Sequence, residues 1–136
     1  MLRFSANLGF LWTDLALTDA IKVAAASGFD AVECHWPFDV PSKFVDSTLK
    51  DFGLPMVSLN TRPGNIKAGD FGIAAVPGRE TQARSYIREA IKYAQEVNAH
   101  SVHVMAGRTD NGEAAENCFR ENLIYASELA ALHNIT

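Results

Sequence analysis

The sequence has little cysteine and no long apolar run. Only Cys34 and Cys118 occur in 136 residues, and they form no CxxC pattern. Isolated cysteines of this kind are typical of reduced, buried side chains, so we expect no disulfide. No apolar stretch is long enough to cross a bilayer, and Asp14 and Asp19 interrupt the region where a signal peptide would stay apolar. These absences predict a soluble protein of the cytoplasm.

The sequence also lacks a block of charge of one sign. Its 12 basic and 16 acidic residues give a formal net charge of −4 and are scattered along the chain. A nucleic-acid-binding surface usually shows a basic stripe, and the glycines match neither the GxGxxG nor the GxxxxGK[ST] phosphate motif. We therefore expect a single domain over residues 1–136 with neither a nucleic-acid partner nor a membrane partner.

Strand-like and helical segments alternate four times. Runs of β-forming residues predict strands at Arg3–Leu8, Phe29–His35, Met56–Asn60 and Ser101–Met105. Apolar residues at helical spacing predict helices from a Thr13 or Asp14 cap to Ser27, at Pro41–Phe52, at Glu80–Val97, and after Gly112 with a stripe of Phe119, Leu123, Ala126 and Ala130. Gly28 and Gly53 should end the first two helices in the left-handed conformation, and His133–Thr136 resembles the approach to another strand.

The two faces of the predicted strands differ in polarity. One face is apolar and comprises Phe4, Ala6, Leu8, Val32, Cys34, Val57, Leu59, Val102 and Val104. The other is mainly polar and comprises Ser5, Asn7, Glu33, His35, Ser58, Asn60, Ser101, His103 and Met105. The element order requires parallel strands, and a doubly wound sheet would be apolar on both faces. The pattern favours four βα units that form the N-terminal half of a (β/α)₈ TIM barrel, with a polar mouth at the strand C-termini.

An ordered set of short motifs resembles a known family. The motifs are RFSANL at residues 3–8, GFDAVE at 28–33, LNT at 59–61, VPGRE at 76–80 and VHVMAGR at 102–108. Together they resemble the N-terminal half of the hydroxypyruvate isomerases and 2-oxo-tetronate isomerases, which belong to the xylose isomerase-like barrels. His35 and Arg62 depart from the family pattern, in which these positions are usually apolar or, for Arg62, proline.

The resemblance implies a reversible aldose–ketose isomerisation of a small sugar acid, such as hydroxypyruvate to tartronate semialdehyde, through an enediol. It also implies a divalent metal, Mg or Mn. The family's catalytic glutamates and metal ligands lie on strands five to eight, beyond Thr136, so none of them is assigned to this chain. We therefore expect these 136 residues alone to be inactive. We also expect a homo-oligomer or a second half-barrel as partner.

Candidate substrate-binding residues lie at the predicted barrel mouth. Glu33, His35 and His103 project inward from the strands, where each either contacts a ligand or is held by a structural hydrogen bond or ion pair. A second group stands at the strand ends and in the following loops, and comprises Asn7, Asn60, Thr61, Arg62, Arg79 and Gly107. Asparagine and threonine serve turns as readily as ligands.

Arginine pairs well with carboxylates, whether these belong to a substrate or to the protein. Arg79 could equally pair with Glu80, Glu89 or a partner chain, and Gly107 could form a small anion nest. Trp12, Trp36 and Phe38 follow the first two strands, where aromatic side chains wall a pocket, pack the barrel top or dock a subunit. Alternative functions are an isomerase or epimerase of another sugar and a non-catalytic half-barrel module. DNA repair is disfavoured by the negative charge.

Overall fold

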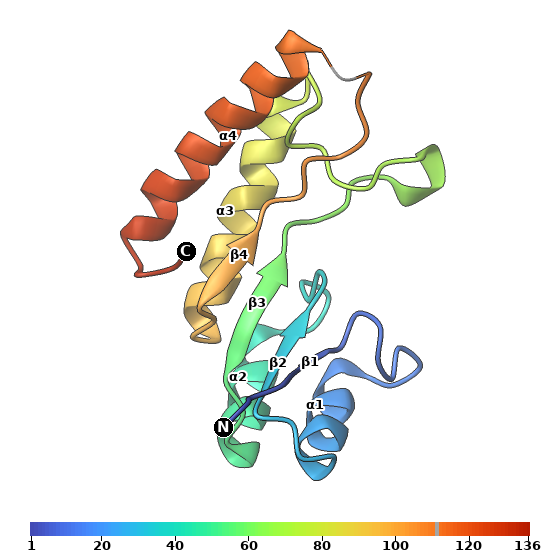
Figure 1. Cartoon of the computed structure of the whole chain (residues 1–136), viewed down its shortest axis with the longest axis vertical. Helices are drawn as coiled ribbons and strands as arrows, with labels where there is room; N and C mark the ends of the chain where they lie inside the picture. Colours follow the sequence, from blue (N-terminus) through green and yellow to red (C-terminus); the bar gives the residue numbers. More distant parts are fainter. Residues whose placement is uncertain (111) are drawn as a thin grey trace.

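The computed structural model describes residues 1–110 and 112–136, in which four parallel strands alternate with four α-helices (Figure 1). The strands are β1 (Ser5–Asn7), β2 (Ala31–Cys34), β3 (Met56–Asn60) and β4 (Ser101–His103). The α-helices are α1 (Leu17–Ala26), α2 (Ser42–Phe52), α3 (Glu80–Glu96) and α4 (Glu113–Ala131), and a short 3₁₀ helix, η1, spans Ile66–Ala68. The sheet order β1-β2-β3-β4 confirms the predicted βα units.

One face of the sheet is buried beneath the helices. Each helix packs against its neighbour in the chain, α1 on α2, α2 on α3 and α3 on α4, as expected of a row of crossover helices. The core combines strand residues with helix residues, namely Ala6, Val32, Met56, Leu59, Ile21, Val45, Ile87 and Ala90. Phe4 was expected on this face, but it is 62% exposed because it lies before β1 and outside the helix layer.

The pairing of β2 with β3 contains a shift of one residue. Val32 pairs with Met56, whereas Glu33 pairs with Ser58, so Val57 is the extra residue. The prediction that Val57 belongs to the packed face is therefore wrong, and Met56 takes its place, with its Sδ 3.8 Å from the Cys34 Sγ. Beyond the shift the alternation is regular, with Leu59 buried and Asn60 on the opposite face.

Two details of the helices also differ from the sequence prediction. The α1 helix begins at Leu17 after Ala16, which makes no side-chain cap, so Thr13 and Asp14 lie in the preceding turn and do not cap it. In α4 the inward position falls on Asn122, and Leu123 is 39% exposed. The Asn122 amide donates to the Ala74 carbonyl (2.8 Å) and its oxygen accepts from Arg84 Nε (3.1 Å), so this buried polar group is satisfied.

Other predictions are confirmed. Gly28 and Gly53 have φ of 82° and 66°, as left-handed helix ends require. Cys34 and Cys118 are free and buried. The Thr136 amide donates to the His100 carbonyl (3.0 Å) and its carbonyl accepts from Val102 (2.8 Å), so the segment after α4 runs beside β4. Within the described residues, no helix has both the length and the apolar character needed to cross a membrane.

The packing of α3 and α4 can be tested by truncating one residue of each. Ile87→Ala removes a side chain that is fully enclosed in the core and should lower the free energy of unfolding by about 2–5 kcal/mol. Leu123→Ala removes a partly exposed side chain and should cost much less. Urea denaturation measures both, and a comparable loss for the two variants would contradict the inward position of Asn122.

Candidate active site

Two rows of polar side chains cross the sheet near the strand C-termini. In the first row Asn7 pairs with Glu33, Glu33 with Ser58 and Ser58 with Ser101. The second, which we call the mouth row, consists of His35, Asn60 and His103. The Asn60 amide donates to the His35 carbonyl (2.7 Å), and Asn60 lies opposite His103. The rows are two residues apart along each strand, a rise of about 6.6 Å, so one small ligand can contact both of them.

The mouth row leaves several hydrogen-bonding groups accessible. His103 Nδ1 lies 3.3 Å from Asn60 Oδ1, the only side-chain hydrogen bond of either residue within residues 1–110 and 112–136. Glu33 is half-buried, and its carboxylate makes no hydrogen bond or ion pair with any described residue. The structural ion pair weighed for Glu33 is therefore not seen in this part of the chain. The arrangement offers one carboxylate acceptor below a row of imidazole and amide groups.

Asn7 and Thr61 are engaged with the backbone. The Asn7 Oδ1 accepts from the Gly9 amide (2.9 Å), which closes the turn after β1. Thr61 is only 3% exposed, and its Oγ1 accepts from the Met105 amide (3.1 Å). These bonds hold the loop after β1 and join the ends of β3 and β4, which are the turn and connection roles that the sequence had left open for both residues.

Arg62 binds a carboxylate of the protein itself. Its Nε and Nη2 donate to the two oxygens of Glu89 on α3 (2.7 and 2.9 Å), and Asp39 lies 3.7 Å from Nη1. The hydrogen bond that Arg62 donates to Glu89 raises the Arg62 pKa. The guanidinium also lies over the Phe38 ring, 4.9 Å from its centroid. Arg62 thus ties the loops after β2 and β3 to α3.

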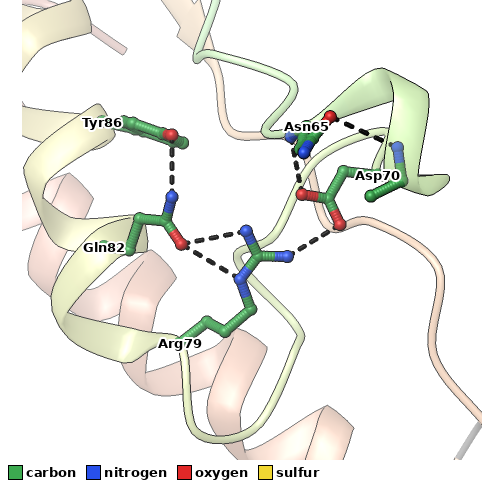
Figure 2. Close-up of polar contacts among 6 residues, drawn as sticks. Asn65, Asp70, Arg79, Gln82 and Tyr86 are labelled. Atoms are coloured by element: carbon green, nitrogen blue, oxygen red, sulfur yellow. Dashed lines mark hydrogen bonds and ion pairs between the residues drawn. The ribbon is translucent and has the colours of Figure 1, made fainter.

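Arg79 is likewise paired inside the chain, but with neither Glu80 nor Glu89. Its Nη1 donates to Asp70 Oδ1 (2.7 Å), and its Nε and Nη2 donate to Gln82 Oε1 (3.0 and 2.9 Å; Figure 2). The bond from Arg79 holds the Asp70 pKa below its ordinary value. Both arginines thus pair with carboxylates of this chain, Arg62 with Glu89 and Arg79 with Asp70.

Gly107 lets two loops approach closely. Its φ is 97°, and a Cβ there would stand 2.3 Å from the Gly72 carbonyl oxygen. Next to it, Gly72 and Ala106 form an antiparallel bridge, and the Ala75 amide donates to Ala106 (2.7 Å). These contacts give Gly107 a packing role between the segment after β4 and the loop after β3.

His35 is surrounded by aromatic rings and by a glycine that the sequence did not single out. Phe10 meets it edge-on at 4.8 Å between ring centroids, and Trp36 lies 5.1 Å away. A Cβ on Gly9 would stand 2.2 Å from the imidazole, so glycine is required there. Burial lowers the His35 pKa, with Glu33 acting in the opposite direction and His103 in the same one.

A cavity of about 290 Å³ opens beside the mouth row, between the loops after β1 and β2. Trp12, His35 and Trp36 line this cavity, so Trp12 and Trp36 lie where aromatic side chains wall a pocket. Phe38 instead packs on Tyr93, with 5.6 Å between the ring centroids. Trp12 has a φ of 54°, a left-handed conformation that strains a bulky residue. Its ring packs edge-on against Phe29 at 6.2 Å.

The described residues do not fit the divalent metal that the sequence resemblance implies. Across residues 1–110 and 112–136, no three His, Cys, Asp or Glu side chains are grouped to hold a metal ion. Cys34 cannot serve readily as a thiolate ligand, because burial raises its pKa to about 12. What these residues supply is hydrogen bonding at the mouth.

Comparisons with known proteins agree with the observed fold. A family model described as the xylose isomerase-like TIM barrel matches residues 21–136. The 2-oxo-tetronate isomerase of Pectobacterium atrosepticum is 41% identical over 99% of this chain and 53% of its own length. The hydroxypyruvate isomerase of Escherichia coli is 33% identical over 99% of this chain and 54% of its own. The chain thus spans about half the length of the curated relatives it matches.

Solved structures give the same picture. The crystal structure of an AP endonuclease, family 2, from Brucella melitensis matches with a TM-score of 0.93 and 35% identity, over 100% of this chain and 54% of that one. A D-allulose 3-epimerase from Methylomonas matches with a TM-score of 0.73 at 15% identity, which shows a shared fold. The predicted half of a TIM barrel is therefore confirmed.

The His35 environment predicts how stability depends on pH. Because its pKa is lowered in the folded state, the unfolded chain binds more protons below the ordinary value of 6.5. The free energy of unfolding should therefore fall as the pH drops from 7 to 5, and His35→Phe should flatten the curve in that window. Urea titrations at each pH measure this, with the exposed His100→Gln as control. An unchanged slope in His35→Phe would contradict the assignment.

Proposed function

Since the chain belongs to the xylose isomerase-like TIM barrel family, we propose that it forms one wall of the substrate site of a small-sugar-acid isomerase. The finer proposal is interconversion of hydroxypyruvate and tartronate semialdehyde, or of a 2-oxo-tetronate, through an enediol. The names of the relatives support it. The structural observation that carries it is the polar mouth, where the Glu33 carboxylate lies beside His35, Asn60 and His103.

Each group at the mouth suits one part of such a substrate. An aldose–ketose isomerisation needs its oxo and hydroxyl oxygens held while a proton moves between neighbouring carbons. The Glu33 carboxylate can accept from a substrate hydroxyl, and the Asn60 amide and a His103 N–H can donate to an oxo or carboxylate oxygen. Arg62 and Arg79 are occupied by Glu89 and Asp70, so we assign the substrate carboxylate to the mouth row.

The proton-transferring glutamates and the divalent metal, Mg or Mn, are not assigned to the described residues. In the family resemblance they belong to strands five to eight, and no group of side chains in the described part of this chain is arranged for a metal. We therefore propose that these 136 residues bind and orient the acid but do not catalyse its isomerisation by themselves.

A role in DNA repair, suggested by the name AP endonuclease of the Brucella structure, is less well supported. A DNA backbone is bound chiefly through Lys and Arg. The mouth carries an unpaired carboxylate with amide and imidazole groups, and the nearby Arg62 and Arg79 form ion pairs with Glu89 and Asp70. The formal net charge of −4 also opposes binding to a polyanion.

The proposal is tested by binding of glycerate, a stable hydroxy acid, followed by NMR. Its addition should shift the amide signals of Glu33, Asn60 and His103. Glu33→Gln replaces a charged acceptor by a neutral one and should weaken binding about tenfold, whereas Glu128→Gln on the exposed face of α4 should leave it unchanged. Equal affinities would remove Glu33 from the site, and tighter binding by Glu33→Gln would place the ligand carboxylate against it.

The open sheet edges support the expected association with a second half-barrel or a second copy. The outer edge of β1 pairs with no described strand, and that of β4 meets only Thr136. Unpaired N–H and C=O groups of this kind are templates for further strands. Light scattering coupled to size exclusion should show a dimer or larger species of the 136-residue chain. A monomer that persists at all concentrations would contradict the proposal.

A further inference from the structure

The loop after β3 forms a projecting arm, which we define as residues 63–72. Figure 1 shows it as a hairpin that leaves the sheet on the side away from α3 and α4. It contains the 3₁₀ helix η1 and carries two exposed apolar side chains, Ile66 (52%) and Phe71 (50%). The whole connection between β3 and α3, residues 61–79, has no other helix, and connections of that length are uncommon in a compact domain unless they serve a function.

The arm links the strand-four side of the mouth to the strand-two side. At its base the Gly72 amide donates to the Pro63 carbonyl (2.7 Å), and Gly72 bridges to Ala106 after β4. On the other side, the Phe71 ring meets the Trp36 ring edge-on, with 6.2 Å between centroids. Trp36 in turn lies against His35 of the mouth row. The arm is thus connected to the mouth row by ring contacts, from Phe71 to Trp36 and from Trp36 to His35.

One hydrogen-bonded chain fixes the arm to α3 (Figure 2). Asp70 Oδ2 accepts from the Asn65 amide (2.7 Å), and the Asn65 side chain accepts from the Ala68 amide (3.3 Å), which closes the arm on itself. Asp70 Oδ1 accepts from Arg79, and Arg79 binds Gln82. Gln82 Nε2 donates to the Tyr86 hydroxyl (2.9 Å).

These contacts point to a positioning role. The α3 helix is anchored in the core by Ile87 and Ala90, so its first turn is a rigid support. Three nitrogens of Arg79 are bonded to Asp70 and Gln82, which leaves it ill placed to clamp a substrate carboxylate. We propose that Arg79 is a positioning residue, which acts through Asp70 to hold Phe71 against Trp36 and so fixes the aromatic side of the mouth. Its effect on ligand binding rests on the proposed function.

The first test needs no ligand. In Arg79→Gln the indole N–H signal of Trp36, assigned by comparison with Trp36→Phe, should shift, and the amides of the arm should exchange about tenfold faster. Asp70→Asn should produce the same changes. Arg79→Lys keeps the charge but replaces the planar guanidinium, which bonds Asp70 and Gln82 through three nitrogens, by a single ammonium nitrogen, and should restore protection only in part. The matched control is Arg88→Gln, which breaks a surface contact to Tyr125 between α3 and α4 and should change neither readout.

An unchanged Trp36 signal and unchanged arm protection in Arg79→Gln and Asp70→Asn would overturn the proposal. If Arg79→Gln loses amide protection throughout the core, Asp70→Asn, which preserves side-chain size, decides on the same two readouts. The ligand test follows with glycerate. Weaker binding by Arg79→Gln than by the parent supports the role at the mouth, and equal binding overturns it. Failure of the parent to bind would count against the proposed function alone, because the indole and exchange readouts still decide the role of Arg79.

Discussion

The candidate site depends on the pairing of β2 with β3. Because side chains alternate between the two faces of a strand, a change of register by one residue would exchange the packed and the open faces. The single shift at Val57 makes Met56 and Leu59 both pack beneath the helices, and it places Ser58 and Asn60 beside Glu33 and His35. Without that shift, the β3 residues at the mouth would be apolar, and the carboxylate of Glu33 would face them.

The loops above the sheet are held by ion pairs that use the charges near the mouth. Arg62 with Glu89 and Arg79 with Asp70 fasten two loops to α3, and the Tyr93 hydroxyl donates to the Val40 carbonyl (2.9 Å) beside them. The two ion pairs balance the charges of Arg62 and Arg79. What remains at the mouth is one carboxylate, amides and imidazoles, a set suited to a small molecule that carries hydroxyl and oxo groups.

Much of this was predictable, because it follows from local chemistry. Alternating polarity identified the barrel half and its polar face, Met56–Asn60 was placed residue for residue, and Gly28 and Gly53 were recognised as helix ends. The start of α1 at Leu17 was missed because a local turn, in which the Leu15 amide donates to the Trp12 carbonyl, precedes the helix. The shift at Val57 and the exposure of Leu123 were missed, since both depend on how separate segments pack together. The same holds at the site, where Gly9 beneath His35 and the Asp70 partner of Arg79 become evident only once the loops are folded together.

The register can be measured directly by scalar couplings across backbone hydrogen bonds in the labelled protein. The structure predicts couplings from the amide nitrogen of Leu8 to the carbonyl carbon of Glu33, from Asn60 to His35, and from Thr61 to His103, which correspond to N···O distances of 2.8, 2.7 and 3.0 Å. These three couplings together would establish that Glu33, His35, Asn60 and His103 share the mouth. A coupling from Thr61 to Val102 or to Val104 instead of His103 would contradict the account, because Asn60 would then not lie opposite His103 and the mouth row would not exist.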